Sequence, residues 1–118
     1  ARRLIEQAMT DAWLPAGGLA YTLDLDGRVA IADRYWWPVS EAIGAYATLL
    51  RLGGTDEDEV AYRRLWTFAQ EHLIDHQRGG WYPELDSDGK PVGRQFHGKP
   101  DIYHSVQAAL LPLLDPPA

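Results

Sequence analysis

The 118-residue sequence contains no cysteine, which excludes disulfides, thiolate nucleophiles and cysteine-bound metals. Positive charge is also scarce, because 11 basic residues stand against 17 acidic ones and give a net charge of -6. A basic surface for nucleic acid is therefore not expected. No apolar run approaches the roughly 20 residues that a membrane helix needs, and the first residues lack the apolar stretch of a signal peptide. We expect a soluble, cytoplasmic protein with no nucleic-acid or membrane partner.

Aromatic residues, in contrast, are abundant, with five Trp and six Tyr. The hydrophobic share of 46% and the charged share of 24% are ordinary for a globular protein. The sequence starts at Ala1 rather than at methionine and enters a helical pattern at once. We therefore expect residues 1–118 to form a single partial domain of something larger.

An internal repeat defines the architecture. Residues 17–28 and 79–90, offset by 62 positions, share the pattern G-G-x4-L-D-x-D-G-[RK]. An Asp-Gly pair between short extended stretches predicts a β-hairpin in each copy. A calcium loop is the alternative, but Arg28 and Lys90 occupy the next alternate position and no glutamate closes a 12-residue frame.

Helical periodicity surrounds both predicted hairpins. Apolar residues recur three and four apart in three stretches, namely residues 2–14, 37–52 and 55–78. Thr55 is the predicted N-cap of the third stretch, and a last helix is predicted from Asp101 to just before Pro116. The resulting order predicts an open, all-α ring in which inner and outer helices alternate. Its exposed edges must be covered by a missing N-terminal part or by another chain, such as a second copy in a homo-oligomer.

The two inner helices begin with matching residues when the offset is relaxed to 66. Trp37 and Glu41 then align with Tyr103 and Gln107, and residues four apart share one helix face. Aromatic rings lie flat against the apolar C–H faces of sugars while nearby polar groups bond the hydroxyls. We therefore predict sugar-binding pocket walls, with Trp37, Tyr103 and the hairpin residue Trp81 as aromatic contacts.

His104 is the candidate proton-transferring residue. It stands three residues after Asp101, the predicted N-cap, so its imidazole belongs to the first helical turn. A helix N-terminus disfavours positive charge, which predicts a neutral imidazole that can accept a proton. A histidine that only bonds a neighbouring loop is the alternative.

Two glutamates are further candidates. Glu41 lies in a helix rich in alanine and leucine, and a carboxylate in apolar surroundings needs a partner or a function. The structural alternative for Glu41 is a buried salt bridge to Arg34. Glu84 lies in the second predicted hairpin, where strand alternation also allows a solvent-facing position.

A metal site is a further alternative. His72, Asp75 and His76 have the spacing H-x-x-D-H, which resembles an inverted zincin pattern with Asp in place of Glu. No third ligand is evident, and the segment ends an outer helix just before a hairpin. We therefore expect ordinary core or surface histidines, with no metal and no other cofactor.

Three motifs carry a family resemblance. Residues 97–108, HGKPDIYHSVQA, resemble the G-K-P-D-x-Y-H-x-x-Q-A segment of the N-acylglucosamine 2-epimerase superfamily. Residues 36–42, WWPVSEA, are similar to the W-x-x-x-E-A segment of its aldose–ketose isomerase branch, which acts on mannose and sulfoquinovose. Residues 79–86, GGWYPELD, resemble that branch's G-x-W-x-x-x-L-D hairpin.

The resemblance implies an (α/α)6 barrel of which this chain is about the C-terminal third. It also implies metal-free isomerisation or epimerisation of a monosaccharide through an enediolate, with two histidines as acid and base. His104 matches one of them, and the second belongs to a helix N-terminal to Ala1. Glu41 is implied as a catalytic, base-supporting residue. Glu84 departs from the glutamine expected at its position. The predicted substrate-binding residues are Trp37, Trp81, Glu84, Tyr103 and Asp101.

Two other functions fit the same residues. A glycoside hydrolase on an (α/α)6 barrel would need two carboxylates that flank the glycosidic bond, and Glu41 and Glu84 are the only plausible pair. A non-catalytic carbohydrate-binding fragment is the other alternative, favoured by the short chain.

Overall fold

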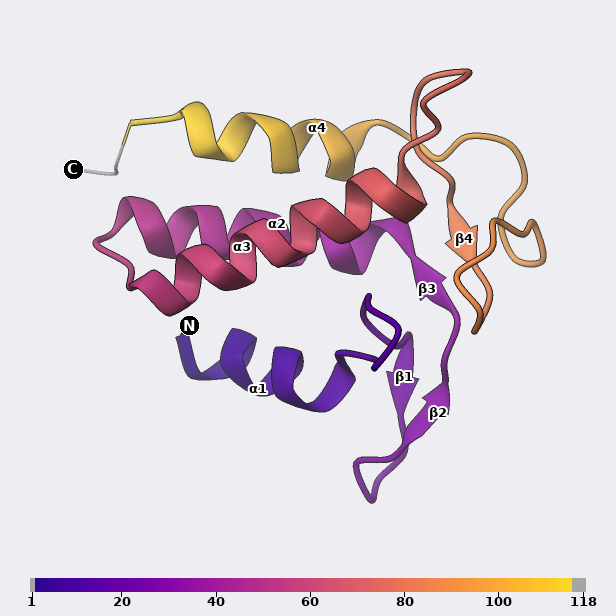
Figure 1. The fold of residues 1–118 in the computed structure, drawn as a ribbon, viewed down its shortest axis with the longest axis horizontal. Helices are drawn as coiled ribbons and strands as arrows, with labels where there is room; N and C mark the ends of the chain where they lie inside the picture. Colours follow the sequence, from indigo (N-terminus) through magenta and orange to yellow (C-terminus); the bar gives the residue numbers. More distant parts are fainter. Residues whose placement is uncertain (1, 116–118) are drawn as a thin grey trace.

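Four α-helices are the main regular elements of the chain in the computed structural model, which describes residues 2–115 (Figure 1). They are α1 (Arg2–Ala12), α2 (Trp36–Arg51), α3 (Asp56–Phe68) and α4 (Tyr103–Leu110). A π-helical turn, Ala69–Leu73, continues α3, and a 3₁₀ turn, Leu111–Leu113, continues α4. The predicted order of helices is confirmed.

Local chemistry sets where the helices begin and end. A capping box starts α3, since the Thr55 hydroxyl accepts from the Asp58 N–H and the Asp58 carboxylate accepts from the Thr55 N–H. The predicted cap is therefore confirmed. The third helix is shorter than expected, because the backbone becomes extended at Ile74, which pairs with Trp81. Pro116, the predicted C-terminal stop of the last helix, lies outside the described residues.

The helices form two antiparallel sets (Figure 1). α2 and α4 run side by side in one direction, while α1 and α3 run in the other. α2 lies at the centre, where it packs against both α3 and α4. This arrangement matches the predicted alternation of inner and outer helices, with α2 and α4 as the inner pair.

Short strands gather where α2 and α4 begin (Figure 1). β1 (Thr22–Leu23) pairs antiparallel with β2 (Val29–Ile31), as the first predicted hairpin requires. β3 (Arg34–Tyr35) pairs antiparallel with β4 (Glu84–Leu85), which belongs to the second repeat. The second predicted hairpin is reduced to its turn and the single bridge between Leu85 and Pro91, while the other edge of β4 pairs with β3 of the first repeat.

The two repeats build the same Asp-Gly turn. Asp24 Oδ1 accepts from the N–H groups of Asp26 and Arg28, and Asp86 Oδ1 accepts in the same way from residues 88 and 90. The glycines that follow, at positions 27 and 89, have φ of 78° and 80°, which only glycine adopts without strain. The carboxylates thus serve the backbone, as the turn prediction requires.

Arg34 joins the two repeats. Only 1% of it is exposed, and burial lowers the pKa of its guanidinium. It donates hydrogen bonds to the carbonyl oxygens of Gly17, Asp86 and Ser87, at 2.7 to 2.9 Å. The alternative of a salt bridge between Arg34 and Glu41 is therefore wrong.

The core lies between α2, α3 and the strands. Val39, Ile43, Leu65, Leu73 and Leu85 each have 0% of their surface exposed. Burying such side chains stabilises the fold by about 1.5–3 kcal/mol each. Within residues 2–115, no helix is both long and apolar enough to cross a bilayer.

Candidate active site

The first turns of the two inner helices lie next to each other. Trp37 is the second residue of α2 and His104 is the second residue of α4. Glu41 lies one turn further along α2. His104 therefore belongs to the first helical turn, as predicted.

His104 and Glu41 form a direct pair. The Nδ1 of His104 lies 2.7 Å from Oε1 of Glu41, across 63 residues of sequence. The two side chains are 26% and 44% exposed, so the pair is reachable from outside. Glu41 thus has a partner, and that partner is the candidate base rather than Arg34.

This contact determines which nitrogen of His104 is available. An ionised carboxylate can only accept, so the Nδ1–H of the imidazole donates to Glu41. Nε2 then carries the lone pair and is the atom that can take a proton from a ligand. A carboxylate that orients an imidazole in this way also stabilises the imidazolium that forms when Nε2 is protonated.

Three aromatic side chains enclose the imidazole of His104. Ring centroids lie at 4.9 Å for Tyr103, 6.1 Å for Trp36 and 6.3 Å for Trp37. The sequence predicted Trp37 and Tyr103 at this place, and the structure brings both to His104. Trp36 was not predicted as a site residue from the sequence. It lies at the start of α2 and is buried, with 5% of its surface exposed.

Phe96 and Tyr21 extend the aromatic cluster and were also missed. The Phe96 ring packs edge-on against Trp36 at 5.3 Å and against Tyr35 at 5.5 Å. Tyr21 packs edge-on against Trp37 at 6.3 Å. Phe96 lies in a segment without sequence periodicity. Tyr21 lies in the first repeat, whose turn pattern does not indicate which element its ring packs against.

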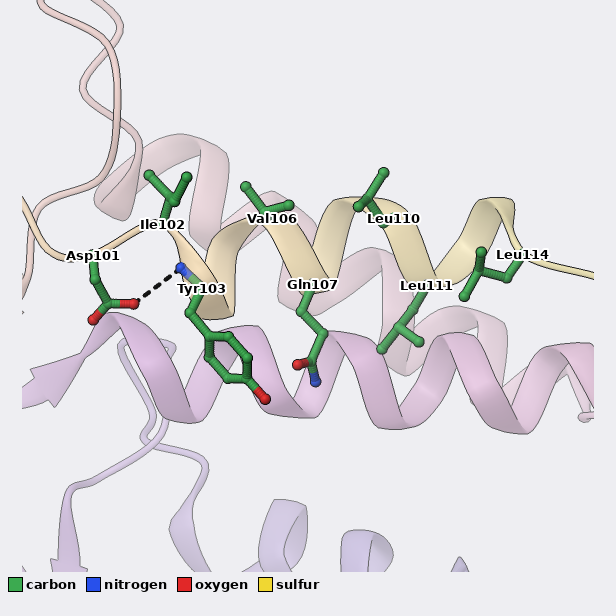
Figure 2. A pocket seen from close by; sticks show the side chains of 8 residues that line it. All are labelled: Asp101, Ile102, Tyr103, Val106, Gln107, Leu110, Leu111 and Leu114. Atoms are coloured by element: carbon green, nitrogen blue, oxygen red, sulfur yellow. Dashed lines mark hydrogen bonds between the residues drawn. The ribbon is translucent and has the colours of Figure 1, made fainter.

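Asp101 lies before α4 rather than at its N-cap. Ile102 holds the cap position without a side-chain hydrogen bond, while Asp101 Oδ1 accepts from the N–H of Tyr103 at 3.0 Å (Figure 2). The predicted cap is thus displaced by one residue, because this hydrogen bond closes a two-residue turn ahead of the helix. The carboxylate still serves a backbone N–H at the start of α4.

Trp81 and Glu84 lie in the interior. Trp81 is 9% exposed and packs against Trp66 at 6.3 Å, so it belongs to the core. Glu84 is 0% exposed, which makes the solvent-facing alternative wrong and leaves it no surface for direct sugar contact. The pKa of the Tyr35 hydroxyl is raised, chiefly because Tyr35 is buried and secondly because of the negative charge of Glu84. The carboxylates of Glu41 and Glu84 are therefore not presented as an open pair for glycoside hydrolysis.

Two hollows border α4. A groove of about 320 Å³ lies between α1, α2 and α4, and Glu41 and Gln107 share its lining. A larger hollow of about 670 Å³ has an almost entirely apolar wall on α4. Figure 2 shows Tyr103 and Gln107 on the side of α4 that faces α2, and Val106 on the opposite side. The predicted pairing of Tyr103 with Gln107 on one face agrees with this view.

The residues of the H-x-x-D-H pattern are engaged separately. The ring of His72 lies 4.9 Å from that of Phe68, and His76 Nε2 lies 2.7 Å from the carbonyl oxygen of Gln70. Asp75 accepts from the ammonium group of Lys99 at 2.5 Å. No group of three metal-ligating side chains occurs in the part of the chain that the structure describes.

Comparison with known proteins identifies the family. The family model described as N-acylglucosamine 2-epimerase (GlcNAc 2-epimerase) matches residues 1–108. This chain belongs to the N-acylglucosamine 2-epimerase family. Its sequence is 38% identical over 117 residues to a D-mannose isomerase of Thermobifida fusca, covering 97% of the chain and 29% of that relative. The predicted family resemblance is confirmed.

Solved structures of the N-acylglucosamine 2-epimerase family agree. A crystal structure of D-mannose isomerase superposes with a TM-score of 0.87 at 30% identity, over 95% of this chain and 29% of the other. A cellobiose 2-epimerase from Bacillus thermoamylovorans B4167 gives 0.71 at 26% identity, over 92% and 28%. These relatives are (α/α)6 barrels, which confirms the predicted fold class. The chain spans less than a third of the relatives' length and forms an arc of that barrel.

Proposed function

We propose that the chain is the part of a sugar isomerase or epimerase that supplies one of the two acid–base groups. The pair formed by His104 and Glu41 carries this proposal, because it presents an oriented imidazole with a free Nε2. The aromatic side chains around that imidazole suit the apolar faces of a sugar. No open carboxylate pair competes for the role among the described residues.

The chemistry follows from the free nitrogen. His104 Nε2 removes the proton from the carbon next to the carbonyl of a ring-opened sugar, and the electron pair moves toward the carbonyl oxygen. The enediolate then accepts a proton either on the neighbouring carbon, which gives the isomer, or on the opposite face of the original carbon, which gives the epimer. For isomerisation, a hydroxyl proton also passes from one oxygen to the other, so no atom is gained or lost.

Glu41 supports each proton transfer. When Nε2 becomes protonated, both ring nitrogens carry hydrogen, and the Glu41 carboxylate balances the positive charge at 2.7 Å. We place Trp37 and Tyr103 against the sugar, since Trp37 is half-buried and Tyr103 is 65% exposed beside the imidazole. Asp101 holds the start of α4 and so sets the direction of the His104 side chain.

The substrate proposal is an aldose–ketose pair, mannose and fructose. It rests on relatives named D-mannose isomerase, while the relative named cellobiose 2-epimerase keeps 2-epimerisation as the second reaction to assay. The rest of the barrel, on the same polypeptide or on another chain, supplies the second acid–base group and closes the pocket. A cytoplasmic location stays a prediction.

Replacing His104 tests the proposal. The assay uses the full-length protein, meaning this chain together with the rest of the barrel. His104→Ala should slow exchange of the C2 proton of mannose with solvent by about 10²–10⁴-fold, the usual contribution of a general base. His76→Ala is the matched control, because that exposed histidine only meets the Gln70 carbonyl at the end of an outer helix. Proton exchange at the wild-type rate in His104→Ala would end the assignment.

Binding without turnover would favour the alternative of a carbohydrate-binding fragment. Calorimetry with simple aldoses and ketoses, run beside the C2-exchange assay on the full-length protein, separates the two functions. Measurable binding by the full-length protein with no C2 exchange would support the non-catalytic alternative.

A further inference from the structure

Glu84 is the buried carboxylate that the proposed chemistry does not use. Its Oε2 accepts from the backbone N–H of Arg94 at 3.1 Å and of Gln95 at 2.8 Å. Its Oε1 is buried and has no hydrogen-bond partner within residues 2–115. Burying a carboxylate is unfavourable unless hydrogen bonds or opposite charges compensate for the lost hydration. We therefore expect Glu84 to have a role through the groups that it contacts.

The residues that Glu84 holds belong to the irregular segment before α4. Residues 92–102 contain no helix or strand, so backbone ladders do not fix their path. Glu84 fixes the middle of this segment through its side chain and the start through its carbonyl oxygen, which accepts from the Val92 N–H at 3.0 Å. Lys99 fixes the far end through Asp75.

Phe96 follows directly after the two anchored amides. Its ring packs edge-on against Trp36 at 5.3 Å, and the Trp36 ring in turn lies 6.1 Å from that of His104. Trp36 is also tied to the segment of Glu84, because its backbone N–H donates to the Pro83 carbonyl oxygen at 3.3 Å. A continuous path of contacts therefore leads from Glu84 through Phe96 and Trp36 to His104.

The path supplies a constraint that Glu41 does not. The hydrogen bond from Nδ1 to Glu41 fixes one point of the imidazole, but the ring can still tilt about that point. The edge of Trp36, at an interplanar angle of 75°, restricts this tilt and hence the direction of Nε2. A displacement of about 1 Å in a reacting group can lower the rate by about 100-fold.

We propose that Glu84 is a positioning residue, which sets the ring orientation of His104 through Phe96 and Trp36 without touching the sugar. This inference rests on the proposed function, in which His104 transfers the proton. It replaces the direct sugar contact predicted for Glu84 from the sequence.

Kinetics of the full-length protein give the first test. Glu84→Ala should lower kcat for mannose–fructose interconversion by about tenfold or more and leave KM within about twofold. Glu84→Gln keeps an acceptor oxygen for both amides and should restore most of kcat. Glu71→Ala, which removes an exposed carboxylate from the outer π-helical turn, is the matched control and should leave both constants unchanged.

Phe96→Ala tests the same path at a residue that is 42% exposed, so the result does not depend on Glu84→Ala folding. It should reproduce the loss of kcat, and the double variant with Glu84→Ala should be no slower than the slower single variant. A raised KM with normal kcat in Glu84→Ala would indicate direct sugar contact and overturn the proposal. Normal kcat in Phe96→Ala would overturn it as well.

A spectroscopic readout separates this inference from the proposed function. The ring current of Trp36 acts on the Cε1–H resonance of His104, which is assigned by its loss in His104→Ala. Glu84→Ala and Phe96→Ala should both move that resonance, while Glu71→Ala should not. An unmoved resonance in both variants refutes the positioning role, whether or not the wild-type protein turns over sugar. Absence of turnover in the wild type, in contrast, refutes only the proposed function.

Discussion

The two repeats share their turns but differ in how each turn is joined to the inner helix that follows. In the first repeat, β2 leads almost directly through β3 into α2, and Arg34 and Tyr35 are held by a strand ladder. In the second repeat, residues 92–102 have no regular structure, and α4 is reached only after them. The first inner helix is therefore placed by backbone pairing, and the second is placed by side chains.

The two side chains of the proposed acid–base pair also come from different repeats. α2, which is 16 residues long and largely buried, contributes the carboxylate of Glu41. α4, with 8 residues and a single buried one, contributes the imidazole of His104. The proposed proton-transferring group, His104, thus lies on the repeat that depends on the tethers of Glu84 and Lys99. The two repeats therefore keep the same turn, while the segments that follow the turns differ in length and in how they are held.

The largest effect is expected from removing the contribution of the first repeat. Glu41→Gln should lower kcat about 10³-fold, or about 4 kcal/mol, because the amide can donate to Nδ1 and leave the proton on Nε2. Stopped assays of mannose–fructose interconversion in the full-length protein measure it. Glu59→Gln, in an exposed pair with Arg63 at 2.6 Å, is the control and should stay within about twofold. A wild-type kcat in Glu41→Gln would show that the Glu41 carboxylate does not support proton transfer by His104.

A smaller effect should distinguish the glycines that open the two repeats. A Cβ at Gly18, where φ is +79°, would lie 2.5 Å from Phe68 Cζ, whereas at Gly80, where φ is +73°, the nearest atom is Lys99 Cδ at 3.6 Å. Gly18→Ala should cost about 3 kcal/mol of unfolding free energy through strain and overpacking, and Gly80→Ala about 1 kcal/mol through strain alone. Urea unfolding measures both free energies. Equal losses in the two variants would mean that the Phe68 ring moves aside for the new Cβ without a cost in stability.

The smallest effect concerns the tether at Lys99. The hydrogen bond from Lys99, helped by the N–H groups of Arg78 and Gln77, lowers the pKa of Asp75 to about 2. Because the folded-state pKa lies below the unfolded value, this stabilisation is complete above about pH 4 and is lost as pH falls through about 2. Lys99→Met should raise the pKa of Asp75 toward its ordinary value, as carboxyl NMR titration would report.

The first repeat supplies the control for this tether. Arg28 and Asp26 form an ion pair at 2.9 Å in which both side chains are at least 70% exposed. Arg28→Met should change the unfolding free energy by less than about 0.5 kcal/mol between pH 2 and pH 5. An unchanged Asp75 titration in Lys99→Met would show that the backbone amides alone hold that carboxylate.

Sequence reasoning succeeded where a property is local. The repeat, the Asp-Gly turns, the cap at Thr55 and the place of His104 in a first helical turn each depend on residues within a few positions of one another. Sequence reasoning failed where the partner is distant. Trp81 lies in the core, and Trp36 and Phe96 belong to the aromatic cluster next to His104, because burial depends on which elements pack together.

The sequence by itself determined the helices, the turns and the family to which the chain belongs, since periodicity, capping and motif spacing are written in short stretches. The contact between Glu41 and His104, and the inward position of Glu84 that holds the segment before α4, follow only from the packing of distant elements. The first contact spans 63 residues and exists because α2 and α4 pack side by side in the same direction. No local pattern encodes such a contact, because it is set by how whole elements fit around the shared core.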